Sequence, residues 1–341
     1  MIYYDVTKSA KSRHASGLMR VNRRLATELD AKITPVVWGK WDPAEARPDD
    51  WYFTTEVFDI EKRPGFDAFL RNPSCRLAAL FPDAIPLQHP RITWPHSVAR
   101  HPRYMHALSR FDHVFAISAA VKNDLAGFWK WQGNRTDTKI SVLPLGADFD
   151  GSARRPSPDS VLGPKLVCVG IVEPRKNQSF LLDVAERLWA EGLSFELDIV
   201  GRVTPHFGAP IAERMRNLAQ SNPQLRFHEA ASDQKFSELL ESARAVVFPT
   251  IAEGCGLPVL ESLWRGLPCV CSDLPVLREN TNEGGCVSLP INDLAAWREG
   301  LKQVLLDDVH WKQLTQTAAA RSLPTWKQSA KNVVNVLLGS A

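Results

Sequence analysis

The chain has 341 residues, of which 44% are apolar and 23% charged, and its formal net charge is +3. The length exceeds what one hydrophobic core usually supports and favours two domains, while the composition excludes a disordered or low-complexity chain. The small net charge gives no reason to expect nucleic acid as a partner.

The chain carries no sign of export or of a membrane span. Its first residues lack a signal-peptide pattern, and no stretch reaches the length of about 18 apolar residues that crosses a bilayer. The six cysteines are scattered without CxxC pairs. We therefore expect a cytoplasmic protein with reduced thiols.

Charge is distributed unevenly along the chain. Basic residues outnumber acidic ones in residues 1–160, and acidic residues slightly outnumber basic ones in the remainder. This distribution suits an anionic acceptor or an anionic membrane surface, but scattered surface charge is the better explanation.

In the first part of the chain, short apolar runs alternate with amphipathic helical stretches. This alternation is typical of βαβ units around a parallel sheet. The predicted strands are residues 2–6, 33–38, 75–81, 113–118 and 140–146. The predicted helices are residues 17–29 and 118–128. Between them, His89, His96 and His101 fall in a proline-rich stretch that we predict to be a loop, without metal-ligand spacing.

Residues 148–164 are rich in Pro, Gly, Ser and charge and are predicted to be a linker. A second α/β series follows. Its predicted strands are residues 165–170, 195–201, 225–229, 245–250 and 267–272, and its predicted helices are residues 177–192, about 210–220, 233–243 and about 292–321. Residues 324–341 carry apolar side chains at helical spacing and predict a closing amphipathic helix. We expect domains 1–155 and 156–323, both Rossmann-like, and the closing helix.

The stretch AEGCGLPVLES, residues 252–262, carries Glu253 and Glu261 around a glycine pair and a proline. It follows a predicted buried strand, so Glu253 lies in the loop at the carboxyl edge of the sheet and Glu261 about one turn into the next helix. The free amides of residues 254–257 suit an anionic phosphate. An ordinary turn with an acid near a helix N-terminus fits these few residues equally well.

The stretch VGIVEPRKNQSF, residues 169–180, places Arg175 and Lys176 between a strand and a helix N-terminus. Two cations are electrostatically unfavourable at that end of a helix, and a broken local rule at the end of a strand indicates function. Such cations would neutralise a diphosphate, Arg through its planar fork and Lys as a point charge. The alternative is a solvated surface pair.

Three further signals are weaker. Gly17, after the first strand, could bring backbone amides close to a phosphate, or could belong to a plain loop. Asp83, at a strand end, could orient an acceptor hydroxyl or cap a turn. The DxD sequence of Asp148 and Asp150 can hold a divalent metal, but it lies beside the linker and is better explained as an acidic turn. We predict no metal site.

Together these segments resemble the retaining glycosyltransferases of family 4, the group 1 glycosyltransferases of GT-B fold. The resemblance covers nearly the whole chain. It rests on FDHVFAISAAVKNDL, ISVLPLGAD, VGIVEPRKN and the E-x7-E motif in PTIAEGCGLPVLESLWRGLPCVCSD. The chain departs from the family at Cys255, where a bulkier residue is usual, and lacks the usual glycine pair before Gly17. The resemblance implies two Rossmann-like lobes facing across a cleft, with the C-terminal helix crossing back to the N-terminal, acceptor-binding lobe.

The resemblance also implies a role for each site residue. Glu253 would contact the donor sugar and Glu261 the ribose, while Arg175 and Lys176 would bind the diphosphate and stabilise its growing charge. Gly17 would border the diphosphate from the other lobe, and Asp83 would lie near the transferred sugar and the acceptor. The turn lining the donor site is Gly254, Cys255, Gly256 and Leu257. Neither a cofactor nor a divalent metal is implied, and the anomeric configuration would be retained.

For the donor, FPDAIPLQHP resembles a stretch of bacterial mannosyltransferases and, with EPRKN, favours a GDP-linked hexose such as mannose. The implied acceptor is a lipid-linked saccharide of O-antigen, capsule or exopolysaccharide synthesis, which allows peripheral association with the inner face of the cytoplasmic membrane. Two alternatives remain open: a sugar-nucleotide 2-epimerase of the same fold, and a non-catalytic nucleotide-sugar-binding protein.

Overall fold

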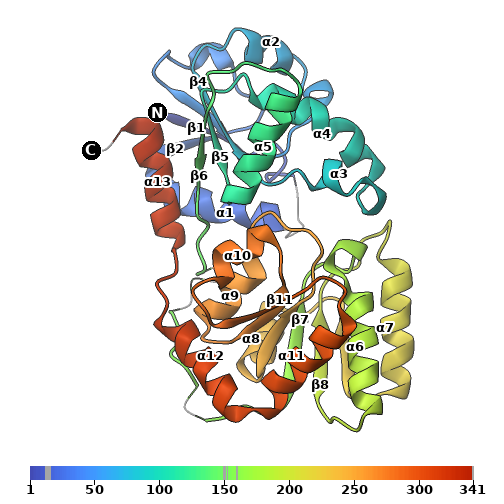
Figure 1. The fold of residues 1–341 in the computed structure, drawn as a ribbon. Coiled ribbons are helices and arrows are strands. Elements are labelled where there is room, and N and C mark those ends of the chain that lie inside the picture. Colours follow the sequence, from blue (N-terminus) through green and yellow to red (C-terminus); the bar gives the residue numbers. More distant parts are fainter. Residues whose placement is uncertain (12–16, 149–150, 152, 159, 340–341) are drawn as a thin grey trace. The chain divides into compact units, whose positions relative to one another are not determined.

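The structure is a computed structural model that describes residues 1–11, 17–148, 151, 153–158 and 160–339. The chain forms two units (Figure 1). The first unit comprises Met1–Phe149 and Pro324–Ala341, and the second comprises Asp150–Leu323. Each has its own α/β architecture, as the alternation of apolar runs and helical stretches predicts.

The first unit is built on a parallel sheet with strand order β2-β1-β3-β4-β5-β6. Its strands are β1 (Ile2–Asp5), β2 (Ile33–Val36), β3 (Trp51–Thr54), β4 (Arg76–Phe81), β5 (His113–Ala116) and β6 (Lys139–Val142). The inner strands are buried along almost their whole length, as expected of a parallel sheet covered on both faces. Strand β3 was not predicted, and it pairs with both β1 and β4.

One helix of the first unit lies where the sequence analysis predicted a loop. They are α1 (Gly17–Leu29), α2 (Phe66–Arg71), α3 (Ile85–Gln88), α4 (Pro95–Leu108), α5 (Ala119–Trp131) and α13 (Trp326–Leu338), with short 3-10 turns η1 (Asp30–Lys32), η2 (Pro43–Glu45), η3 (Ile60–Lys62) and η4 (Pro90–Ile92). The region predicted as a proline-rich loop is largely α4: Pro95 stands in its first turn, where a missing amide hydrogen is harmless, and Pro102 lies inside it.

Helix α13, red in Figure 1, packs against α1 although the two are separated by most of the sequence. Trp326 at its start is fully buried. The backbone of Gly146 approaches it so closely that a Cβ at that position would lie 2.3 Å from the Trp326 nitrogen. The backbone amide of Ala147 donates a hydrogen bond of 2.8 Å to the Pro324 carbonyl. The last helix is therefore an integral part of the first unit.

The second unit contains a parallel sheet with strand order β12-β11-β10-β7-β8-β9. Its strands are β7 (Lys165–Val169), β8 (Glu196–Val200), β9 (Leu225–His228), β10 (Ala245–Phe248), β11 (Cys269–Ser272) and β12 (Cys286–Leu289). Its helices are α6 (Gln178–Ala190), α7 (Ala209–Ser221), α8 (Asp233–Glu241), α9 (Leu257–Trp264), α10 (Pro275–Thr281), α11 (Leu294–Leu306) and α12 (Asp308–Ala320), with the 3-10 turn η5 (Pro174–Lys176).

Each sheet has one point at which the order of its strands reverses. In the first unit the chain moves from β1 to β2 on one side and then crosses to β3 on the other, so the reversal lies between β1 and β3. In the second unit it lies between β7 and β10. Loops diverge at such a point beyond the carboxyl ends of the strands, and there open α/β sheets bind their ligands.

The six cysteines are free, and all but Cys286 are buried. Within the described residues, no helix is both long enough and apolar enough to cross a bilayer.

Candidate functional site

The loops that follow β7 and β10 meet at the strand-order reversal of the second unit. After β7 the chain makes the 3-10 turn η5, in which Pro174 takes the first position, and Asn177 adopts a left-handed conformation with φ of 58° before α6 begins. The Ile251 amide of the other loop donates to the Arg175 carbonyl at 2.9 Å. This bond ties the loop that carries the two cations to the loop that carries Glu253.

One carboxylate oxygen is the centre of the cluster. Oε1 of Glu253 accepts hydrogen bonds from Lys176 Nζ at 2.6 Å and from Arg175 Nη1 at 2.8 Å. It also accepts one from the Thr250 hydroxyl at 2.7 Å. The three donors come from two loops separated by more than 70 residues of sequence, so only the fold brings them together.

The neighbours of the two cations hold them in place. Arg175 also donates from Nη2 to Glu173 at 2.7 Å and from Nη1 to the Ala252 carbonyl at 2.8 Å. The Lys176 ammonium lies 4.6 Å from the centre of the Phe248 ring, a distance typical of a cation–π contact. The cations therefore have fixed positions beyond the ends of β7 and β10.

The charges of this cluster shift one another's protonation. Burial on its own raises the pKa of the Glu253 carboxyl, but Arg175 and Lys176 outweigh it, so the pKa lies below its ordinary value. Burial lowers the pKa of the Lys176 ammonium; Glu253 opposes this shift, and the neighbouring guanidinium of Arg175 adds to it. The direction at Glu253 thus follows from the two cations that share its carboxylate, whereas the direction at Lys176 follows mainly from burial. Glu253 is ionised at neutral pH.

The turn from Gly254 to Leu257 leads directly into α9. Gly256 has a φ of 78°, and a Cβ there would lie 2.3 Å from Leu277, so the turn requires glycine at this position. Cys255 is buried, its carbonyl accepts from Asn280 Nδ2 at 2.5 Å, and burial raises the pKa of its thiol to about 12. The thiol is thus protonated at neutral pH and is no nucleophile.

The remaining predicted residues belong to other elements of the chain. Glu261 is buried on α9, five positions after Gly256, as the sequence predicts. Asp83 and Gly17 belong to the first unit. Asp83 Oδ1 accepts the Ile85 amide at 3.0 Å, which is the turn-capping alternative considered for it. Gly17 is exposed at the start of α1, and the loop before it, residues 12–16, lies outside the described residues.

The acidic pair beside the linker is only half described. Asp148 Oδ1 accepts the backbone amide of Trp326 at 2.8 Å, and its Oδ2 lies 3.8 Å from Arg24 Nη2, so Asp148 supports the start of α13. Asp150 lies outside the described residues. In the part of the chain that the structure describes, no group of three or more His, Cys, Asp or Glu side chains could hold a metal ion.

Thr250 is a residue that the sequence analysis missed. It is fully buried, lies two residues beyond the end of β10, and donates to the same Glu253 oxygen as the two cations. Its position at the end of the predicted strand 245–250 is the signal by which it could have been found, because side chains there lie at the carboxyl edge of the sheet.

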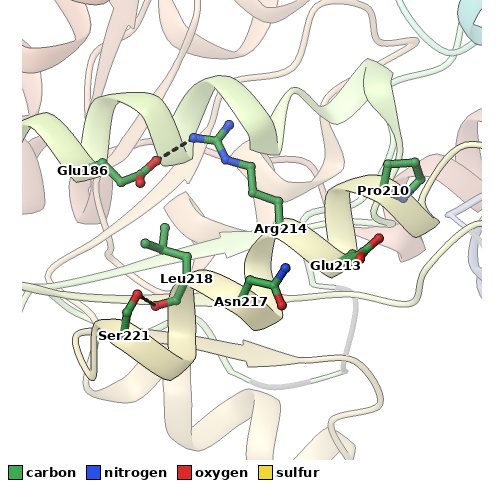
Figure 2. A pocket seen from close by; sticks show the side chains of 7 residues that line it. All are labelled: Glu186, Pro210, Glu213, Arg214, Asn217, Leu218 and Ser221. Carbon is green, nitrogen blue, oxygen red and sulfur yellow. Dashed lines mark hydrogen bonds and ion pairs between the residues drawn. The ribbon is translucent and has the colours of Figure 1, made fainter.

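A surface hollow of about 510 Å³ on the second unit lies elsewhere, between α6 and α7 (Figure 2). Arg214 reaches across it from α7 to Glu186 of α6, at 2.5 Å, and also pairs with Asp183 at 2.6 Å. Its cation is thus already matched by carboxylates of the protein. The carboxyl ends of β7 and β10 are the better candidate for a ligand site, because Arg175 and Lys176 there share a single carboxylate oxygen of Glu253.

Comparison with known proteins identifies the family of this part of the chain. A family model described as "Glycosyl transferases group 1" matches residues 163–307, which include β7, β10 and the whole Glu253 cluster. Residues 163–307 are a group 1 glycosyltransferase domain. The resemblance drawn from EPRKN and the E-x7-E motif is thereby confirmed.

Curated relatives of the glycosyltransferase domain carry related names. The chain is 27% identical over 272 residues to "Serotype-specific mannosyltransferase WbdA" of Escherichia coli, covering 73% of this chain and 32% of that one. It is 31% identical over 161 residues to "O-antigen chain mannosyltransferase B" of Escherichia coli, covering 47% and 40% of the two chains. The chain thus spans less than half of the length of either relative.

The fold has solved counterparts. A crystal structure of Anabaena Alr3699/HepE in complex with UDP and glucose aligns over 99% of both chains, with a TM-score of 0.72 and 13% identity. At that identity the likeness concerns the fold alone. The chain has the GT-B fold, as predicted.

Proposed function

We propose that this chain is a retaining, metal-independent hexosyltransferase that transfers mannose or a related sugar from a GDP-linked donor to a saccharide acceptor. The observation that carries the proposal is the cluster of Arg175, Lys176 and Glu253 at the strand-order reversal of a group 1 glycosyltransferase domain. The names of the relatives support mannose and O-antigen synthesis. A lipid-linked acceptor would bring the protein to the inner face of the cytoplasmic membrane.

In the proposed reaction the two cations bind the donor diphosphate. The bond between the anomeric carbon and the phosphate oxygen breaks, and negative charge grows on that oxygen. Arg175 and Lys176 stabilise this charge, so they contribute most in the transition state. This is the task that a divalent ion performs in metal-dependent transfer, and two protein cations can perform it without one.

Glu253 has two functions in this scheme. One oxygen fixes both cations, and the other is available to accept a hydrogen bond from a donor-sugar hydroxyl. Glu261 binds the ribose, and the amides of residues 254–257 approach the phosphates. The acceptor hydroxyl attacks from the same face as the leaving group, and its proton passes to the leaving phosphate oxygen. Asp83 and Gly17 contribute from the first unit.

Nucleotide binding tests the donor. Thermal unfolding is followed with GDP, UDP, dTDP and their hexose conjugates. GDP and GDP-mannose should raise the melting temperature most, since a ligand at about 100 times its dissociation constant adds about 2.7 kcal/mol to the free energy of unfolding. Lys176→Ala should abolish the rise, and Lys312→Ala, an exposed lysine of the same unit, should leave it intact. A larger rise with UDP would overturn the GDP assignment.

A second experiment distinguishes sugar transfer from epimerisation and from binding without turnover. Radiolabelled GDP-mannose is incubated with protein, with and without a lipid-linked saccharide extract. Label in the saccharide fraction is expected only when both are present. Isomerised sugar nucleotide without acceptor would indicate a 2-epimerase, and tight GDP-mannose binding without any turnover would indicate a binding protein.

A further inference from the structure

The turn at the start of α9 is held from one side by α10. Residues 254–257 form this turn, and Asn280 of α10 donates from Nδ2 to the Cys255 carbonyl at 2.5 Å. Leu277, about one turn earlier on α10, lies so close that a Cβ at Gly256 would be 2.3 Å from its Cδ2. Both contacts lie within the second unit, and they place α10 directly against the turn.

The bond from Asn280 sets the direction of the peptide group between Cys255 and Gly256. This peptide is trans, and in a planar trans peptide the carbonyl and the amide hydrogen point in opposite directions. Because the Cys255 carbonyl points to Asn280, the Gly256 amide hydrogen points away from α10. One side-chain bond therefore determines where a backbone donor of the turn is aimed.

The side away from α10 is the side of the two cations. The strand order β12-β11-β10-β7-β8-β9 places β11 and β7 on opposite sides of β10. Helix α10 follows β11, the turn follows β10, and Arg175 and Lys176 follow β7. The Gly256 amide is thus aimed toward the part of the site where the donor diphosphate binds in the proposed reaction.

The Gly256 amide is also unused within the protein. Gly256 is buried, and among the described residues no backbone or side-chain acceptor takes its amide hydrogen. Buried backbone donors without a partner are rare in native proteins, and one at a candidate binding site is expected to meet an acceptor of the ligand. A phosphate oxygen is well suited, since hydrogen bonds to charged groups are the stronger ones.

Glycine alone would not keep this peptide in place. Gly256 has no Cβ, and glycine adopts positive and negative φ about equally readily, so the peptide can reverse with little steric resistance. A reversal would turn the amide toward α10 and the Cys255 oxygen toward the diphosphate, whose negative charge would repel it. The bond from Asn280 opposes this reversal, because the reversal would break it.

We propose that Asn280 is a positioning residue for the nucleoside diphosphate of the donor: by holding the Cys255 carbonyl, it directs the Gly256 amide to a phosphate oxygen. Asn280 does not itself touch the donor. Its effect should therefore appear only with ligands that carry phosphates. The assignment rests on the proposed function, because it places the diphosphate beside Arg175 and Lys176.

Binding of a nucleotide and of its nucleoside to the full chain tests this role. Equilibrium dialysis measures the dissociation constants of radiolabelled GDP and guanosine; if UDP gives the larger thermal shift, UDP and uridine take their place. Asn280→Leu keeps the approximate size of the side chain and removes the donor. It should weaken GDP binding about tenfold, the loss expected for one hydrogen bond to a charged group, and should change guanosine binding by less than about twofold.

Further variants complete the comparison. Asn280→Gln keeps an amide donor and should recover part of the GDP affinity. Asn282→Leu is the matched control, since Asn282 is an exposed asparagine at the end of the same helix, and it should bind both ligands like the unmutated protein. Melting temperatures identify a variant that fails to fold, and Asn280→Ala then replaces Asn280→Leu.

A purely structural Asn280 would give a different result. Asn280→Leu would then weaken GDP and guanosine binding by the same factor or change neither, and either outcome overturns the proposal. Sugar transfer by the unmutated protein is measured separately. Transfer together with an equal loss for both ligands would refute the role of Asn280 and leave the proposed function standing. A loss confined to GDP, without any transfer, would refute the transferase and leave the role of Asn280 standing.

Discussion

The Glu253 carboxylate illustrates how single residues are arranged in this protein. It would be costly to bury alone, and it is kept ionised by two cations and a hydroxyl that all contact the same oxygen. The cations are equally dependent on Glu253, since its loss would leave both partly buried with less compensation. Each side chain in the cluster therefore fixes the protonation and the position of the others.

Thr250 is predicted to be a positioning residue within this cluster. Thr250→Val removes the hydroxyl that donates to Glu253 while keeping the shape of the side chain. We expect the ratio kcat/KM for sugar transfer to fall about tenfold, the effect of losing one hydrogen bond to a charged group. Thr250→Ser should recover most of the activity.

A purely structural role for Thr250 would give a different result. In that case Thr250→Val would lower the melting temperature without lowering kcat/KM at a temperature where the protein stays folded, and Thr250→Ser would not rescue activity.

At the scale of elements, α4 shows how packing changes the pKa of a histidine. His101 is 2% exposed, and its Nε2 donates to the Asp83 carbonyl at 2.9 Å. Burial lowers its pKa to about 4. His101 is therefore neutral at physiological pH and joins α4 to the loop after β4, next to Arg100 and Asp83.

This shift predicts a pH dependence of stability. The unfolded chain binds a proton at His101 near pH 6.5, whereas the folded chain binds it only near pH 4. Unfolding thus takes up a proton between these values, and stability falls as the pH drops from 6.5 to 4, by up to about 3 kcal/mol. His101→Gln should remove this part of the loss in urea unfolding curves.

The matched control is His106→Gln, on the exposed side of the same helix. It should follow the pH dependence of the unmutated protein. If His101→Gln followed it as well, His101 would not be the group that titrates.

At the scale of the whole molecule, the two units differ in how many segments of the chain each of them contains. The second unit is one continuous segment, whereas the first is completed by α13 from the far end of the sequence. The Trp326 side chain is fully buried, and the Ser329 hydroxyl donates to the Pro144 carbonyl at 2.6 Å. We therefore infer that the first unit depends on α13 for its stability.

Separate expression of the units tests this inference. Residues 150–323 should fold alone and bind GDP, whereas residues 1–149 alone should be less stable than residues 1–149 joined by a short Gly/Ser linker to residues 324–341. The hydrogen bond from Ala147 to Pro324 shows that a short linker suffices. In the full chain, Trp326→Ala should destabilise the first unit by about 3–5 kcal/mol. Equal stability of residues 1–149 with and without α13 would contradict the inference.

Most elements could be predicted from local pattern, and the failures have local causes. β3 was missed because its run of four residues is short and leads directly into the acid Glu56; pairing with β1 and β4 makes it a central strand. α4 was missed because Pro95 and Pro102 disfavour a helix on their own. Packing of Tyr104, Met105 and Leu108 into the core outweighs that cost.

By itself, the sequence determined the α/β class, the closing helix, and the chemistry of the candidate site. Arg175, Lys176 and Glu253 could be identified because each follows a strand, and the cations break a local electrostatic rule. Only the tertiary structure decided that all three share one oxygen, that Thr250 joins them, and that the backbone amides of Lys8 and Ser9 donate to Glu56. The physical reason is distance along the chain: these groups come from loops far apart in sequence, and the order of the strands in each sheet brings those loops together.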